Sequence, residues 1–115
     1  FDERPDVDLD LMQPQQTLAD ITANVVRSFS RTLDELKPDL VLVHGDTTTA
    51  MAAAMAAFYK RIRIGHVEAG LRSFDLDRPW PEEFNRVVID AVAEFAFAPT
   101  ASSRDNLLGE DNKRA

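Results

Sequence analysis

The sequence contains no cysteine, which excludes a disulfide framework and any metal site built on thiolates and permits a reducing compartment. It has no run of about 18 apolar residues, so it predicts no membrane-spanning helix. Basic residues are few, 13 against 20 acidic ones, and the net charge of -7 argues against nonspecific binding to nucleic acid or an anionic membrane surface. The first residues, FDERPDVDLD, lack an initiator Met and the apolar region of a signal peptide. We therefore expect a fragment of a longer protein.

The first half of the chain predicts two helices around a strand. Its 115 residues suffice for one domain or a piece of one. Apolar residues recur at steps of three and four over 18–36, which predicts a helix that Pro38 ends. Residues 39–45 form a short, continuous apolar run, which is typical of a parallel strand covered on both faces. The Ala- and Met-rich stretch that follows predicts a closely packed helix, with Asp46 or Thr47 as its N-cap.

The second half continues the alternation. Residues 61–67 and 95–99 predict two further strands, and a last helix is expected to begin near Thr100. Between them, 82–94 predicts an amphipathic helix. Its inward face is expected to carry Phe84, Val87, Val88, Ala91 and Val92, and its other side Glu82, Arg86 and Asp90. Alternating helices and strands of this kind predict an α/β fold with a parallel sheet.

Three polar motifs follow predicted strands or open a predicted helix: HGDTTT, HVEAGLR and PWPEE. Ligands of open parallel sheets bind beyond the carboxyl ends of the strands. We therefore expect Asp46, Glu68 and Glu82 to converge on one cleft. Neighbouring carboxylates suit proton transfer, because mutual repulsion and burial raise the pKa of one while another stays ionised. Arg72 and Arg86 would hold them in place or bind substrate oxygens.

Structural interpretations of these acidic residues stay open. One interpretation of Asp46 is that it is only an N-cap. On pattern alone, an ion pair with Arg72 in the same loop is the favoured interpretation of Glu68. Glu82 and Glu83 would each favour the first turn of a helix through its dipole.

The same holds for the other polar and aromatic residues. His44 and His66, at strand ends, are more often hydrogen-bonded structural residues than catalysts. Trp80 is expected to be a packing anchor. The two histidines lack the HExxH spacing of a helical zinc site, and no glycine-rich nucleotide loop occurs, so we expect neither a metal nor a dinucleotide cofactor.

Together, HGDTTT, HVEAGLR and PWPEEFNR resemble the bacterial, non-hydrolysing UDP-N-acetylglucosamine 2-epimerase family in order and spacing. MQPQQTLADIT before them and FAPTASSRDNLL after them also match, so the resemblance covers roughly residues 1–110. It implies a Rossmann-like parallel sheet flanked by helices, forming part of one half of a glycosyltransferase-B-like two-domain fold. Residues 1–115 would be a partial N-terminal domain that lacks the first strand, its GTRPE-type phosphate loop and the whole C-terminal domain.

The resemblance also implies an activity. Members interconvert UDP-GlcNAc and UDP-ManNAc by eliminating UDP to a 2-acetamidoglucal and adding it back with inversion at C2, without metal or nicotinamide. The catalytic carboxylates carry over to Asp46, Glu68 and Glu82. Binding or supporting positions carry over to His44, Thr47, His66, Arg72 and Arg86. Gln16 matches a position that contacts a second UDP-GlcNAc in regulated members.

The resemblance further implies a cytoplasmic homodimer that serves cell-envelope polysaccharide synthesis, and we expect the 115 residues alone to be inactive. Three alternatives remain open. They are an epimerase of a related UDP-2-acetamido sugar, a hydrolysing relative that releases free ManNAc, and a non-catalytic sugar-nucleotide binding module.

Overall fold

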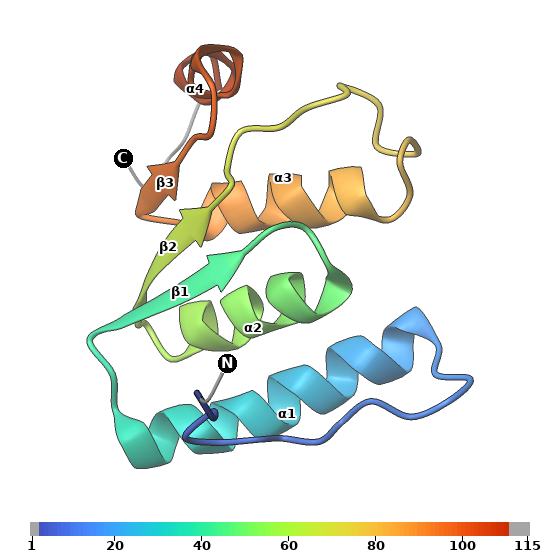
Figure 1. Ribbon diagram of the computed structural model, residues 1–115, viewed down its shortest axis with the longest axis vertical. Helices are drawn as coiled ribbons and strands as arrows, with labels where there is room; N and C mark the ends of the chain where they lie inside the picture. Colours follow the sequence, from blue (N-terminus) through green and yellow to red (C-terminus); the bar gives the residue numbers. More distant parts are fainter. Residues whose placement is uncertain (1–2, 111–115) are drawn as a thin grey trace.

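The computed structural model describes residues 3–110, along which helices and strands alternate as the sequence predicts (Figure 1). The helices are α1 (Leu18–Leu36), α2 (Thr48–Tyr59), α3 (Glu82–Val92) and α4 (Ala101–Leu108). The strands are β1 (Leu40–His44), β2 (Arg63–Val67) and β3 (Phe95–Phe97). Within residues 3–110, none of the helices has the length and apolar character that crossing a membrane requires. The predicted α/β class is confirmed.

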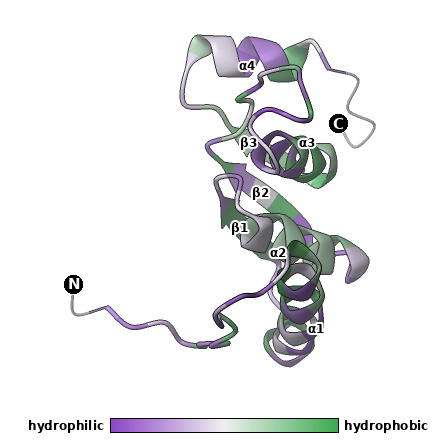
Figure 2. Ribbon diagram, turned by 90° about the vertical axis from the view of Figure 1, so that its right-hand side faces the viewer, coloured by the Kyte–Doolittle hydropathy of each residue, from purple (hydrophilic) through white to green (hydrophobic). Residues whose placement is uncertain are grey.

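The three strands form a parallel sheet in the order β1-β2-β3. Val41 pairs with Ile64, and Gly65 pairs with Phe95. The crossover helices α2 and α3 lie on one face of the sheet, and α1 lies alongside α2 (Figures 1 and 2). All three strands therefore end at the same edge, where the loops that follow them are gathered.

Local signals in the sequence set the helix ends. Thr17 and Asp20 form a reciprocal capping box at the start of α1. The helix ends at Leu36, where Lys37 adopts the left-handed conformation of a C-cap and donates its N–H to the carbonyl of Leu33, and Pro38 follows because it cannot continue the helix. Thr47 caps α2 by accepting a hydrogen bond from the backbone of Ala50, which leaves the side chain of Asp46 available for other contacts.

The alanines of α2 allow several elements to approach the helix closely. Ala52, Ala54, Ala56 and Ala57 are fully buried. The core cluster joins this helix to Val41 and Val43 of β1, Ile64 of β2 and Ile89 of α3. Small side chains let α1, α3 and the sheet pack around one helix, so the predicted close packing is confirmed.

The prediction that the first strand is covered on both faces is wrong for the described residues. Val41 and Val43 are buried, whereas Leu42 is 59% exposed. On the edge strand β3, Phe97 is 54% exposed. Both crossover helices lie on the opposite face of the sheet, so these apolar side chains remain accessible.

The predicted inward face of α3 is partly wrong. Phe84 is 47% exposed and Ala91 is exposed as well, while the predicted Val87, Val88 and Val92 are only half-buried. The buried residues of this helix are Glu83, Asn85, Ile89 and Asp90. Polar residues can lie inside here because positive groups and hydrogen-bond donors compensate the buried carboxylates, as described below.

Gly70 provides a test of the packing between the loop after β2 and α4. Its φ of +89° is a left-handed conformation, and a Cβ placed there would lie 2.3 Å from the backbone oxygen of Ser103. We expect Gly70→Ala to destabilise the protein by about 3 kcal/mol, through overpacking and backbone strain. The midpoint of urea unfolding measures this effect. Gly109→Ala is the matched control, because its Cβ would lie 3.5 Å from the nearest oxygen, and equal midpoints for the two variants would contradict the expectation.

Candidate functional site

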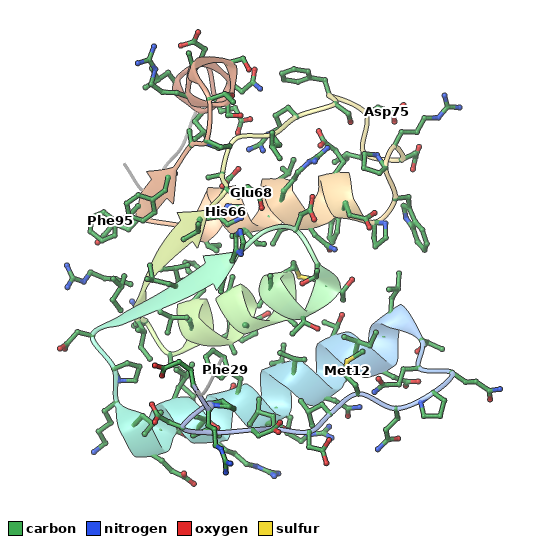
Figure 3. All side chains as sticks on the ribbon, in the orientation of Figure 1. Met12, Phe29, His66, Glu68, Asp75 and Phe95 are labelled. Carbon is green, nitrogen blue, oxygen red and sulfur yellow. The ribbon has the colours of Figure 1, made fainter. Side chains whose placement is uncertain are left out.

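The loops that follow β1 and β2 begin side by side. The Gly45 N–H donates to the carbonyl of Val67 at 3.1 Å, which joins the ends of the two strands. Glu68, the next residue along, lies near the end of β2, whereas Asp75 lies farther out on the long loop that leads to α3 (Figure 3). The parallel sheet thus places the HGD and HVE motifs next to each other, as predicted.

Glu68 is held in an exposed position above this edge. Its φ of +71° is left-handed, and its N–H donates to the carbonyl of Phe97 on β3. Its Oε2 lies 3.1 Å from Nε2 of His44, and both side chains are exposed. His44 thereby orients the carboxylate without burying it. The alternative pairing of Glu68 with Arg72 is wrong, because Arg72 pairs elsewhere.

Asp46 is tied to α3 by two contacts. Its carboxylate lies 3.4 Å from Nη1 of Arg86, and its backbone oxygen accepts a hydrogen bond from Nδ2 of Asn85 at 3.0 Å. Asn85 also donates to the hydroxyl of Thr48 at 3.3 Å. The interpretation of Asp46 as only an N-cap is wrong, since Thr47 performs that role and its hydroxyl oxygen is engaged there. The β1–α2 loop is therefore fixed against α3.

The two acids that open α3 lie in different environments. Glu82 is half-buried in the first turn, one turn before Arg86, so both lie on the side of the helix that meets Asp46. Glu83 is 1% exposed and accepts hydrogen bonds from the N–H groups of Ser73 and Phe74 and from Nε of Arg86 at 2.6 Å. Glu83 thus anchors the loop and orients Arg86, a role that its sequence position at a helix start did not indicate.

A second polar cluster is buried beneath the loops. Nδ1 of His66 lies 2.5 Å from Oδ1 of Asp90, and the other carboxylate oxygen of Asp90 accepts from Nη2 of Arg72 at 2.8 Å. Arg72 also contacts Glu110, with Nε 2.6 Å from Oε1. His66 is fully buried, and both of its ring nitrogens are hydrogen-bonded. Arg72 supports Asp90 rather than any of the three predicted catalytic carboxylates.

The buried carboxylates have lowered pKa values. Burial alone would raise the pKa of Asp90, but the hydrogen bond and charge of His66 and the guanidinium of Arg72 outweigh it and lower the pKa below 3.8. Burial likewise opposes ionisation of Glu83, yet Arg86 and the two backbone N–H donors lower its pKa below 4.5. For Arg72, burial is outweighed by Glu110 and Asp90, which raise the pKa of the guanidinium.

The lowered pKa values of Glu83 and Asp90 predict that the folded protein loses stability in acid. A carboxyl group whose pKa is lower in the folded state stabilises that state above its unfolded pKa, and this stabilisation is lost as pH falls through the folded value. We expect the urea midpoint to fall between about pH 5 and about pH 2, with Asp90 and Glu83 contributing. Glu83→Gln should flatten this dependence. Identical pH profiles for Glu83→Gln and the unsubstituted protein would contradict this assignment.

An apolar groove of about 830 Å³ lies between α1, α2 and the start of α3, and Asn85, which donates to the backbone oxygen of Asp46, forms part of its lining. Trp80 lines it and is 65% exposed, so its prediction as a packing anchor is wrong for the described residues. Gln16, the predicted regulatory residue, precedes α1 and uses its amide locally: Nε2 donates to the carbonyl of Leu11, and Oε1 accepts from the N–H of Gln13. These contacts shape the turn before α1.

Residues 3–110 contain no cluster of three or more His, Cys, Asp or Glu side chains able to hold a metal ion. The arrangement instead offers carboxylates at a loop edge, each steadied by a neighbouring His or Arg or by a helix start. Such groups can accept and donate protons without moving far. Fold and site together define a Rossmann-like α/β protein with carboxylates at the carboxyl edge of its sheet.

Comparisons with known proteins identify the family. The family model described as UDP-N-acetylglucosamine 2-epimerase matches residues 1–115. The chain is 51% identical over 110 residues to the UDP-N-acetylglucosamine 2-epimerase of Neisseria meningitidis serogroup A, covering 96% of this chain and 30% of that protein. It is 55% identical over 107 residues to the Escherichia coli K12 enzyme of the same name, covering 93% of this chain and 28% of that protein.

Solved structures agree. The crystal structure of the N. meningitidis UDP-GlcNAc 2-epimerase bound to UDP-GlcNAc matches with a TM-score of 0.88 at 51% identity, over 91% of this chain and 28% of that one. The crystal structure of the Methanocaldococcus jannaschii UDP-GlcNAc 2-epimerase in complex with UDP-GlcNAc and UDP matches with a TM-score of 0.87 at 38% identity. The match covers 97% of this chain and 30% of that one. The chain belongs to the UDP-N-acetylglucosamine 2-epimerase family. It spans about 30% of the length of its relatives and forms part of one half of their glycosyltransferase-B-like fold.

Proposed function

We propose that the complete protein containing this chain interconverts UDP-GlcNAc and UDP-ManNAc. The observation that carries the proposal is the 51–55% identity, over 93–96% of the chain, to proteins named UDP-N-acetylglucosamine 2-epimerases. Residues 1–115 then form a partial N-terminal domain, and the remaining contacts to the nucleotide come from the rest of the protein. A cytoplasmic location, a homodimeric state and a role in cell-envelope polysaccharide synthesis are further proposals that rest on family membership.

The proposed reaction removes the C2 proton while the C1–O bond to UDP breaks, so that a C1–C2 double bond forms and UDP leaves with the electron pair. Re-addition of UDP at C1 with protonation on the other face of C2 gives the epimer. The C2 proton is weakly acidic, so both a positioned base and stabilisation of the leaving group are needed. We assign proton removal, proton return and assistance to the leaving group to Asp46, Glu68 and Glu82 collectively.

The surrounding contacts support this assignment. The His44–Glu68 pair leaves an oriented, accessible carboxylate at the end of β2. Arg86 contacts Asp46 at 3.4 Å and lies one helical turn after Glu82 on α3, so its charge favours the ionised form of Asp46. A binding-only module for a diphosphate would favour basic groups at this edge rather than acids. We keep Gln16 as a proposed contact for a second, regulatory nucleotide sugar.

The complete gene product incubated with UDP-GlcNAc in deuterated water provides the test. Proton NMR should show deuterium entering at C2 and UDP-ManNAc appearing together. Free ManNAc and UDP would indicate a hydrolysing enzyme instead. If neither exchange nor a new sugar appears, the proposed substrate is wrong, and related UDP-2-acetamido sugars are the next to test.

A further inference from the structure

His66 lies in the middle of the buried polar cluster with both ring nitrogens engaged. Its side chain is 0% exposed. Nδ1 lies 2.5 Å from Oδ1 of Asp90, and Nε2 lies 2.7 Å from the backbone oxygen of Gly45. One nitrogen therefore faces α3, and the other faces the loop that carries Asp46.

These two partners define the protons on the ring. A backbone carbonyl only accepts, so Nε2 must carry a proton to bond Gly45. Asp90 receives the N–H of Gly70 at 3.1 Å and the guanidinium of Arg72 at 2.8 Å on its other oxygen, and both donors favour an ionised carboxylate. An ionised Asp90 also only accepts, so Nδ1 must carry a proton too.

We propose that His66 is a buried imidazolium that positions Asp46 for catalysis by clamping the Gly45 carbonyl to Asp90. The part of this inference that concerns the positioning of Asp46 rests on the proposed epimerase function. The charges of the cluster balance, because His66 and Arg72 face Asp90 and Glu110. Paired and hydrogen-bonded in this way, a buried cation is tolerated.

The His66 contact is one of several that hold the short turn after β1. Gly45 has a φ of +82°, a conformation that glycine adopts without strain. His66 fixes the carbonyl of Gly45, Asn85 fixes the carbonyl of Asp46, and Arg86 contacts the Asp46 carboxylate. Losing the His66 contact would free the peptide that joins Gly45 to Asp46. A small displacement of a catalytic group can lower the rate about 100-fold.

Two substitutions separate the two ends of the ring. Glutamine places an amide donor near the position of Nε2, whereas asparagine places one near Nδ1. In the complete gene product, His66→Asn should lower kcat for UDP-GlcNAc epimerisation roughly 10- to 100-fold with KM changed less than about threefold. His66→Gln should recover part of that kcat, because it retains a donor toward Gly45. A purely structural role would lower the amount of folded protein in both variants without this split between kcat and KM.

The charge state is read directly from nitrogen-15 NMR of the unsubstituted protein. Both ring nitrogens of His66 should show bound protons and imidazolium shifts at neutral pH, with the signals assigned by through-bond correlation to the backbone of His66. A spectrum of a neutral tautomer overturns the inference, even if both variants fail to fold. An active unsubstituted protein with kcat retained within about twofold in His66→Asn overturns the positioning role. If the unsubstituted protein is inactive, the proposed function and the positioning role of His66 are both overturned. The spectrum still decides the charge state of His66 in that case.

Discussion

Replacing any one of the three proposed catalytic carboxylates by its amide should lower kcat of the complete protein about 10²- to 10⁴-fold. The variants are Asp46→Asn, Glu68→Gln and Glu82→Gln. Each amide keeps the shape of the side chain but cannot take up or release the proton that the reaction moves. The measurement is the initial rate of UDP-ManNAc formation, with circular dichroism to verify that the variants fold.

A matched carboxylate elsewhere on the chain controls for a general loss of charge. Asp34 is exposed on α1 and pairs with Lys60 at 2.9 Å, so Asp34→Asn should leave kcat unchanged. The assignment of a residue would be wrong if its amide variant retained kcat within about threefold. Because the three residues come from three separate loops or helix starts, each is tested independently of the others.

Removing Arg86 should give the largest loss of stability, about 3–5 kcal/mol. Arg86→Met keeps the apolar stem but leaves the carboxylate of Glu83, which is 1% exposed, without its cation. It also releases Asp46, so kcat should fall as well. Urea unfolding of the complete protein measures the first effect, and the epimerase assay measures the second.

Arg104 offers the matched control, because it forms an exposed ion pair with Asp105 at 3.4 Å. Arg104→Met should change stability by less than about 0.5 kcal/mol. Adding Glu83→Gln to Arg86→Met should restore part of the lost stability, because the unpaired charge is then removed. Equal effects of Arg86→Met and Arg104→Met would show that the Glu83–Arg86 pair contributes no more than an exposed one.

The sequence predicted the elements well because their signals are local. The three- and four-residue spacing of α1, the alanines of α2 and the apolar runs of the strands each depend on neighbours in the chain. The edge that carries both the β1–α2 loop with Asp46 and the end of β2 with Glu68 was also predictable, since parallel strands must end together. The pairing of His44 with Glu68 could not be predicted, because a sequence pattern alone does not give the direction of a side chain.

The face of α3 was mispredicted for a physical reason. A periodic pattern treats Glu83 and Asp90 as outward-facing because isolated charges avoid the core. Their cations come from elsewhere: Arg86 from the next turn, and His66 and Arg72 from β2 and the loop after it. Long-range compensation of this kind leaves no spacing signal, so sequence reasoning missed the roles of Glu83, Asn85 and Asp90 as anchors.

The anchors on α3 also determine where the chain tolerates a change of length. Glu83, Arg86 and Asp90 are separated by three and four residues, so they recur on one side of the helix. Inserting one residue between Glu83 and Asp90 would rotate one anchor by about 100° relative to the other, and a single helix orientation could no longer satisfy both. An insertion at the exposed residues 75–78 lies outside the helix and leaves Glu83 and Asp90 on the same side of it. We therefore expect natural length variation in this part of the fold to fall in the loop and to spare the helix.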